Sequence, residues 1–189
     1  GKTTHAGLLH TWLKQRGFQV VRREEPTEGP VGRLIHSVLD KRVGLADEAI
    51  PLLFAADRAD DTRRFIRPEL EKGTIVICDR YTYSSLAYQS VGMAVPFDAK
   101  WLKEINTYAL PADIVFYFDV EPDVGLRRVS GGQRLQDDTY FEDLKTQRRI
   151  REAYFRILGL DKPSSIIKKL ETNGIPATVL DSVRISKLD

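Results

Sequence analysis

A short apolar run that ends in an acid and an arginine constrains the fold of this chain more than any other feature. Residues 75–80, IVICDR, have the β-branched composition of a buried strand, and the segment 84–91 that follows has helical spacing. Short apolar runs alternate with helix-like segments throughout the 189 residues, with no internal repeat. This order favours an α/β fold in which helices flank a parallel sheet.

Regular spacing of apolar residues predicts the other elements of a single domain. Strands are expected where β-branched and aromatic residues cluster, at 18–21, 74–79, 113–120 and 175–181. Helices are expected where apolar residues recur every three or four positions, at 5–17, 31–39, 47–72, 84–91, from 98 onward, 140–158 and 164–170. Asp47 is the expected N-cap of the long helix 47–72, because its carboxylate can accept hydrogen bonds from the first turn.

Composition bounds the partners and the location. Lysine plus arginine number 29 against 27 aspartate plus glutamate, and the net charge of +2 creates no long-range field that would attract nucleic acid or an anionic membrane. The single cysteine, Cys78, lies in the apolar run 74–79, which favours a buried strand residue over a reactive thiol or a disulfide. No run of about 18 apolar residues predicts a membrane helix. We therefore expect a cytoplasmic protein without nucleic-acid or membrane partners.

The first four residues, GKTT, match the end of the phosphate-binding loop G-x-x-x-x-G-K-[ST]. In such a loop the backbone N–H groups face the phosphates, the lysine reaches the β and γ oxygens, and the hydroxyl ligates Mg²⁺. The pattern assigns ATP binding to Gly1, Lys2, Thr3 and Thr4, with Thr3 as a metal ligand. Taken alone, GKTT is as readily a chance tetrapeptide, so other residues must decide.

Asp79 and Arg80 come directly after the apolar strand and before the next helix. Open α/β sheets bind ligands beyond the carboxyl ends of their strands, where this pair is expected to lie. Asp79 can hold hydrated Mg²⁺, and Arg80 can neutralise charge on a transferring phosphoryl group. The alternative is an ion pair at a strand end, but both motifs point to one phosphate ligand.

Four ordered blocks give the chain a specific resemblance: GKTT at 1, EEPTEG at 24, FAADR at 54 and DRYTYSSLAYQ at 79. Together with LPADIVFYFDVEPDVGLRR from 110, they resemble the thymidylate kinase family and cover most of the chain. The resemblance implies a P-loop NTPase fold, with helices on both faces of a parallel sheet in three layers. It also implies Mg²⁺- and ATP-dependent phosphorylation of thymidine monophosphate (dTMP) for DNA precursors, by a homodimer.

The acceptor site is assigned partly by spacing and partly by the resemblance. Phe54 and Arg58 are four residues apart, hence on one helical face, and the resemblance implies that they stack on thymine and hydrogen-bond it. A core phenylalanine beside a surface arginine is the alternative. Ser85 and Gln89 have the same spacing and are implied as substrate contacts, because an amide both donates and accepts, like the N3 and O4 edge of thymine. Glu25 is implied as a loop acid near the sugar or phosphate.

Phosphoryl transfer requires that two nucleotides are held in line and that water is excluded. The expected catalytic residues are Lys2, Arg80 and an arginine of a mobile lid at about 130–151, where glycines permit movement. Arg134 is the candidate lid arginine. The other arginines of that segment are expected to be exposed helix charges.

Some positions depart from the family pattern. Glu24 stands where a basic residue commonly precedes Glu-Pro, and His36 stands where many members have arginine, so His36 is either a weak cation or a helix-surface histidine. The family begins with a strand and the first part of the phosphate loop, so we expect about a dozen or more residues before Gly1. The family also usually adds a final helix beyond SVRISKLD.

Two other functions remain open from the residues. A related kinase for another monophosphate or a nucleoside would share Lys2 and Asp79 but would need a different base edge from that of Arg58 and Gln89. A nucleotide switch or non-catalytic nucleotide-binding module lacks support, because no N-K-x-D guanine motif is present while a second, base-reading group of residues is.

Overall fold

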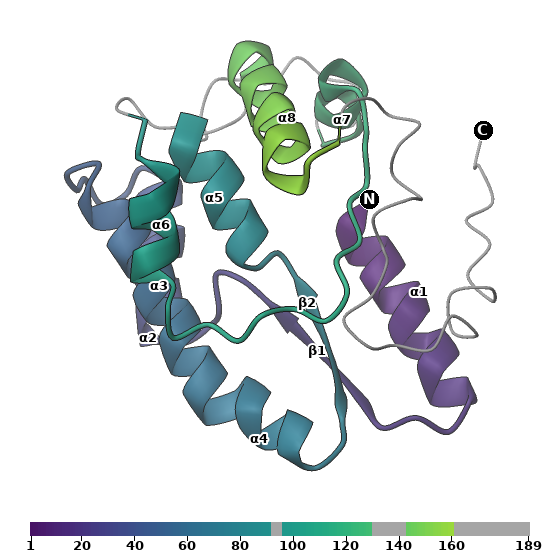
Figure 1. Ribbon diagram of the computed structural model, residues 1–189. Helices are drawn as coiled ribbons and strands as arrows, with labels where there is room; N and C mark the ends of the chain where they lie inside the picture. Colours follow the sequence, from purple (N-terminus) through teal and green to yellow (C-terminus); the bar gives the residue numbers. More distant parts are fainter. Residues whose placement is uncertain (92–95, 130–142, 161–189) are drawn as a thin grey trace.

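Two parallel strands form the centre of the protein (Figure 1). The computed structural model describes residues 1–91, 96–129 and 143–160. Strand β1 (Val20–Glu24) pairs with β2 (Ile75–Asp79) in parallel, in the register Val20↔Ile75 to Glu24↔Asp79. The α/β order and the parallel pairing expected from the sequence are thereby confirmed for this part of the sheet. The two carboxyl ends lie side by side, which brings the residues after Glu24 next to those after Asp79.

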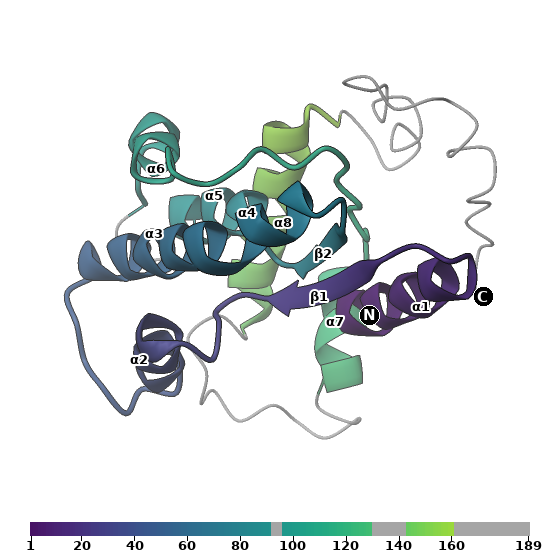
Figure 2. The same ribbon diagram turned by 90° about the horizontal axis from the view of Figure 1, so that it is seen from below.

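Helices surround the strands, with α1 on the opposite side from α2 and α3 in both views (Figures 1 and 2). Helix α1 packs on both strands, α5 packs on α6 and α8, and α3 contacts α2, α5 and α6. The helical elements are α1 (Lys2–Gln15), α2 (Pro30–Leu39), α3 (Ala49–Asp61), the π-helix η1 (Thr62–Ile66), α4 (Arg67–Glu71), α5 (Thr82–Val91), α6 (Ala99–Ile105), α7 (Pro122–Val129) and α8 (Leu144–Leu158).

Local sequence explains several helix boundaries. Helix α6 begins after Asp98, whose carboxylate accepts hydrogen bonds from the N–H groups of Lys100 and Trp101. Asp143 caps α8 in the same way through the N–H of Thr146, at 2.8 Å. Helix α8 ends at Gly159, whose φ of 62° is readily adopted only without a side chain.

The expected helix 47–72 is formed, but it differs at its start and in its middle. It begins at Ala49 after Glu48, so the prediction of Asp47 as N-cap was wrong. The reason is that backbone carbonyls take the first N–H groups: Ala49 donates to Ala46 and Ile50 donates to Asp47. The interior contains the π turn η1 shortly before Pro68, which has no N–H to donate to the preceding turn.

The expected strand at 113–120 is not formed, and this prediction was wrong. Alternate side chains do face opposite ways: the ring of Tyr117 packs on Tyr154 of α8 at 5.1 Å, and the ring of Phe118 packs on His5 of α1 at 4.7 Å. A strand also requires a neighbour for its backbone groups, and within the described ranges β2 pairs only with β1. The side chains of Tyr117 and Phe118 therefore point in opposite directions, as in a strand, although the segment has no backbone pairing with β2.

Buried apolar side chains form two clusters in the described part of the chain. One joins Ala87 and Val91 of α5 to Ile150 and Ala153 of α8. The other joins Val38 of α2 to Ile50 of α3. The expected helix 164–170 and strand 175–181 lie outside the described residues. No helix in the described part of the chain has the length and apolarity needed to cross a membrane.

Candidate active site

The phosphate-loop sequence meets the end of β2. The hydroxyl of Thr3, in the first turn of α1, donates to Oδ2 of Asp79 at 2.5 Å. Residues 76 positions apart are therefore in direct contact, as expected if both serve one phosphate ligand. Beside them, the N–H of Glu25 donates to the carbonyl of Asp79 at 3.2 Å, which extends the parallel pairing into the turn after β1.

The pair Thr3 and Asp79 has the donor chemistry of a magnesium site. Asp79 is buried, and its second oxygen, Oδ1, has no hydrogen-bond partner. Nowhere in the described ranges do three or more His, Cys, Asp or Glu side chains cluster as a complete metal cage. Mg²⁺ usually takes only one or two carboxylates and completes its shell with water and substrate phosphate oxygens, so these two residues fit it.

Two cations lie beside this carboxylate. Arg80 follows Asp79 with a φ of 68°, an uncommon conformation for a residue with a side chain. Its guanidinium carbon lies 4.9 Å from the centre of the Tyr88 ring. Desolvation of the Lys2 ammonium lowers its pKa, and the charge of Arg80 lowers it further. Lys2 as a residue is exposed, and the charges of Asp79 and Glu24 partly offset this lowering of its pKa.

Tyr88 of α5 belongs to the surroundings of Arg80, although the sequence analysis gave it no role. Burial acts to raise the pKa of its hydroxyl, but the charge and hydrogen bond of Arg80, followed by the charge of Lys2, lower it overall. Tyr88 therefore holds the guanidinium of Arg80 through both its ring and its hydroxyl. Its spacing of eight residues from Arg80 across a turn carries no helical signal, so the contact was not predictable.

A buried ion pair joins the turn after β1 to α3. Nη2 of Arg58 donates to Oε2 of Glu25 at 2.5 Å, and Nε donates to the same carboxylate at 2.9 and 3.2 Å. The side chains are only 2% and 3% exposed. Nη2 of Arg58 also donates to Oγ of Ser85 in α5, at 3.0 Å. Three of the residues implied for the acceptor site are thus brought into contact.

Burial raises the pKa of Glu25 to about 7, because the loss of hydration outweighs the stabilising charge and hydrogen bonds of Arg58. The nearby carboxylates of Asp57 and Asp61 raise it further. The protonation state of this carboxyl is therefore sensitive to small changes near neutral pH.

Asn106 and Asp57 complete this network, and the sequence reasoning missed both. Nη1 of Arg58 donates to Oδ1 of Asn106, whose own amide donates to the carbonyl of Leu102 at 2.7 Å. Asp57 accepts two hydrogen bonds from Thr27. Asn106 only follows the end of a helix, which does not indicate a functional role. Asp57 lies within FAADR, between the assigned residues Phe54 and Arg58, so its position in the sequence could have suggested a role.

The other residues predicted for the site are not part of the Glu25–Arg58 ion pair. Phe54 is half-buried and packs on the cluster of Val38 and Ile50. Gln89 is 2% exposed, and its Oε1 has no hydrogen-bond partner, so it offers a buried acceptor. Gly1 and Thr4 lie at the exposed start of α1, and Arg134 lies outside the described residues.

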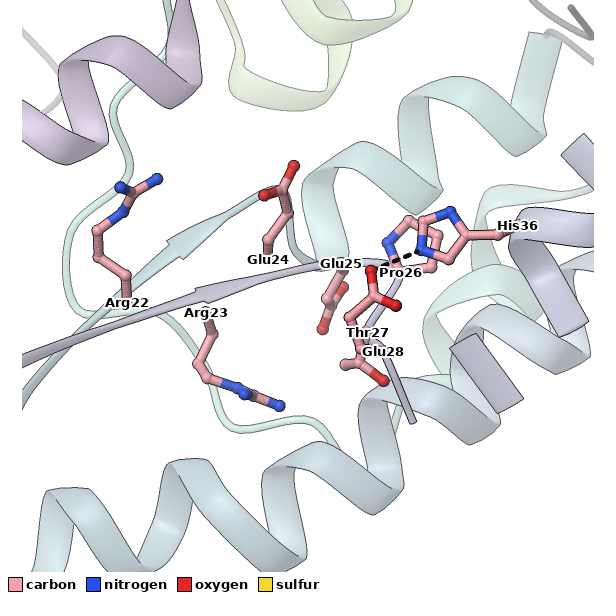
Figure 3. Close-up of a pocket in the computed structure, with 8 residues that line it drawn as sticks. All are labelled: Arg22, Arg23, Glu24, Glu25, Pro26, Thr27, Glu28 and His36. Atoms are coloured by element: carbon pink, nitrogen blue, oxygen red, sulfur yellow. Dashed lines mark ion pairs between the residues drawn. The ribbon is translucent and has the colours of Figure 1, made fainter. Parts of the chain in front are cut away.

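The turn after β1 lines a cavity of about 330 Å³ (Figure 3). Basic and acidic side chains both line it. The lining residues are Arg22, Arg23, Glu24, Glu25, Pro26, Thr27, Glu28 and His36. His36 is half-buried in α2, and its Nε2 lies 3.8 Å from a carboxylate oxygen of the exposed Glu28. A wall of mixed charge suits a polar, charged ligand such as a nucleotide rather than an apolar one.

These features define the class of protein. A threonine of the GKTT sequence bonded to an acid at the end of a parallel strand, with a lysine and an arginine beside it, is an arrangement typical of nucleotide-binding phosphotransferases.

Comparison with known proteins identifies the family. The model of the thymidylate kinase family matches residues 1–174. The chain is 39% identical over 180 residues to a probable thymidylate kinase of Thermococcus kodakarensis, covering 90% of this chain and 85% of that protein. It is 37% identical over 175 residues to a probable thymidylate kinase of Pyrococcus abyssi, with 90% and 83% covered. A thymidylate kinase of Thermomicrobium roseum is 38% identical over 157 residues, with 82% and 74% covered. The chain belongs to the thymidylate kinase family, whose members are nucleoside monophosphate kinases.

Proposed function

We propose that this protein transfers the γ-phosphoryl group of ATP to dTMP, giving dTDP and ADP. The observation that carries the proposal is the contact between Thr3 and Asp79 in a chain that belongs to the thymidylate kinase family. This contact joins the phosphate-loop sequence to the strand end at which an α/β fold binds its ligand.

The donor side of the site is formed by residues 1–4 and Asp79. Backbone N–H groups at the start of α1 face the phosphates of ATP, and the ammonium of Lys2 reaches the β and γ oxygens. Its lowered pKa reflects an ammonium that is already partly desolvated. Thr3 and Asp79 would hold Mg²⁺, which supplies charge neutralisation on the transferring group.

Arg80 stabilises the charge that spreads over the phosphoryl oxygens during transfer. Tyr88 fixes the direction of its guanidinium, so little reorganisation is needed at the moment of reaction. Arg134 is proposed to add a second arginine from a lid that closes over both nucleotides and excludes water. Without closure, water would compete with dTMP for the phosphoryl group.

The acceptor side is formed by Glu25, Phe54, Arg58, Ser85 and Gln89. The base stacks on the exposed part of Phe54 and meets the polar edge of Arg58, Ser85 and Gln89. The unpartnered Oε1 of Gln89 supports this assignment, because a buried amide oxygen without a hydrogen bond is costly unless a ligand supplies a donor such as N3–H of thymine. Glu25 orients Arg58 from the opposite side.

Several wider features belong to the same proposal. Residues 1–189 form one P-loop domain with helices on both sides of the parallel sheet, acting as a homodimer in the cytoplasm. The thiol of Cys78 is free, and burial raises its pKa to about 12, which suits a reducing compartment and an inert thiol. A kinase for another monophosphate or a nucleoside, and a non-catalytic module, are not favoured, because the matched family is that of thymidylate kinases.

The test is ADP release by the purified full chain with Mg²⁺ and ATP against a panel of acceptors: dTMP, dUMP, UMP, CMP and thymidine. We expect dTMP to give the highest kcat/KM, and Lys2→Ala to remove release with every acceptor. Preference for another monophosphate would contradict the base assignment while leaving the phosphate chemistry in place. Absence of any acceptor-stimulated release would contradict the proposed reaction itself.

A further inference from the structure

Helix α3 contacts the end of β1 and the turn after it at three alternate residues. Arg23 forms an ion pair with Asp61, Glu25 pairs with Arg58, and Thr27 is hydrogen-bonded by Asp57. Alternate residues of a strand point to one side, which accounts for Arg23 and Glu25, and positions 57, 58 and 61 share one helical face. Figure 3 shows Arg23 and Glu25 on the side facing α3, with Arg22 and Glu24 pointing the other way. We refer to these three contacts as the α3 seam.

The contact of Asp57 with Thr27 is the best defined part of the α3 seam. Oδ2 of Asp57 accepts the N–H of Thr27 at 2.8 Å, and Oδ1 accepts the Thr27 hydroxyl at 2.6 Å. The same hydroxyl accepts the N–H of Gly29 at 3.0 Å. Asp57 is 3% exposed, so both of its oxygens are committed to this one residue away from water. Charge-assisted hydrogen bonds of this kind are about twice as strong as neutral ones.

Helix α2 closes the turn from the other side. A Cβ atom at Gly32 would lie 1.9 Å from the carbonyl oxygen of Thr27, far inside contact distance. The backbone of Thr27 is therefore held between Gly32 and Asp57. Because Glu25 precedes Thr27 by only two residues, this hold on Thr27 also restricts where Glu25 can lie.

We propose that Asp57 is a positioning residue for the acceptor nucleotide, acting through Thr27 on the Glu25–Arg58 pair. The inference rests on the proposed function, and it adds a residue that touches no ligand. Glu25 and Thr27 line the charged cavity, and Arg58 presents its guanidinium to Ser85 and Asn106. Asp57 and Arg58 are consecutive, so the helix that orients the guanidinium also holds the wall of the cavity. The phosphate-loop contact of Thr3 with Asp79 lies outside the α3 seam.

This arrangement predicts a split between the two substrates. Loss of the hold on Thr27 lets the turn move, which changes the wall of the charged cavity and the direction of the Arg58 guanidinium. We expect KM for dTMP to rise roughly ten-fold or more, because a hydrogen bond to a buried charge is lost. KM for ATP should change less than about three-fold, because the substitutions remove no contact of the phosphate-loop residues 1–4.

The substitutions are chosen in matched pairs. Thr27→Val removes the hydroxyl at nearly constant volume, and Thr27→Ser retains it. Asp57→Ala removes the acceptor. Asp60→Ala is the control on the same helix, because Asp60 forms an ion pair with Arg64 at the exposed surface. The KM for each substrate, kcat, the dTMP dissociation constant by calorimetry and the thermal midpoint are measured for each variant.

Support requires that Thr27→Val and Asp57→Ala raise KM and Kd for dTMP and that Thr27→Ser and Asp60→Ala do not. The double variant Thr27→Val/Asp57→Ala should be no worse than the worse of these two single variants, because both remove the same contact. A lowered thermal midpoint with unchanged dTMP affinity would assign Asp57 to stability alone and overturn the proposal. If Asp57→Ala does not fold, the two Thr27 variants decide. If the wild type prefers another monophosphate, the proposed acceptor is wrong, and the same comparison made with that monophosphate judges the positioning role.

Discussion

Arg80 shows how one residue can carry a conformational cost for a chemical purpose. A non-glycine residue at φ 68° costs free energy, and such residues persist mainly where the surroundings hold them. Here the ring of Tyr88 lies against the guanidinium, and Asp79 immediately precedes it. This backbone conformation directs the side chain of Arg80, just after the end of β2, toward the region where we propose that the transferring phosphoryl group lies.

Replacement of Arg80 by alanine should lower kcat by about two to three orders of magnitude, because a charge used most in the transition state is removed. Binding of ATP should change by only a few-fold, as Lys2 and the loop remain. Steady-state kinetics and ATP titration measure the two effects. Arg63→Ala, at an exposed position in η1, is the control and should behave as wild type. Unchanged turnover would remove Arg80 from the catalytic residues.

Glu25 predicts a dependence of stability on pH. Its pKa is about 7 in the native state and 4.5 ordinarily, so between these values the native protein holds a proton that the unfolded chain has released. This contribution to stability is fully present below pH 4.5 and is lost as pH rises through about 7, by about 3 kcal/mol in total. Glu25→Gln is neutral at every pH and should remove this part of the slope.

The measurement is the free energy of unfolding in urea at several pH values, for wild type and Glu25→Gln. Glu28→Gln is the matched control, because the side chain of Glu28 in the same turn is exposed. Parallel pH curves for wild type and Glu25→Gln would show that the Arg58 partnership keeps Glu25 ionised across this range.

At the scale of elements, the position of α2 against the turn after β1 depends on close backbone packing. Pro30 begins α2, and Gly32 in its first turn lies directly against the backbone of Thr27. The sequence predicted the helix from its apolar spacing at 31–39, but it gave no sign of this contact. A glycine within a helix usually lowers stability, so its presence here is explained by the lack of room for a side chain.

Gly32→Ala should therefore destabilise the protein by about 1–3 kcal/mol, since the backbone of Thr27 must shift to admit a methyl group. Gly44→Ala is the control, because a Cβ there meets nothing within 4 Å. Urea unfolding compares the two variants. Equal stability of Gly32→Ala and Gly44→Ala would mean that α2 can move away from the turn at little cost.

At the scale of the whole molecule, the proposed donor and acceptor sites are linked to the fold through different elements. The donor site joins the start of α1 to the end of β2, whereas the acceptor residues join the turn after β1 to α3 and α5. A ligand that binds only the native state stabilises it by about 2.7 kcal/mol at a hundred times its dissociation constant. Each ligand should therefore raise the thermal midpoint by itself.

A non-hydrolysable ATP analogue with Mg²⁺ should raise the midpoint by several degrees, and chelation of the metal should remove most of this rise. Asp79→Asn should abolish the metal-dependent part, because a ligand oxygen with charge is lost. The rise with dTMP alone is the internal control and should persist in Asp79→Asn. A full ATP response in Asp79→Asn with Mg²⁺ would contradict the proposed metal site.

The candidate site was predictable where it depends on strand ends and was not where it depends on the meeting of distant polar groups. Thr3 and Asp79 were expected to serve one ligand, because a phosphate loop and a strand end have fixed places in an α/β fold. Asn106 was missed, since a polar residue after a helix is ordinary. Glu25 and Arg58 were both named, but their mutual ion pair was not.

By itself, the sequence determined the kinds of element, their order and the residues that can serve phosphate chemistry, because periodicity, turn residues and motifs act over a few neighbouring positions. Only the tertiary structure decided which polar groups pair and which extended segment becomes a strand. Residues 23, 25 and 27 meet α3 because the chain passes beside that helix. Residues 113–120 have the pattern of a strand but no described neighbour to bond. Hydrogen-bond partners and burial come from segments far apart in the chain, and local preference cannot specify them.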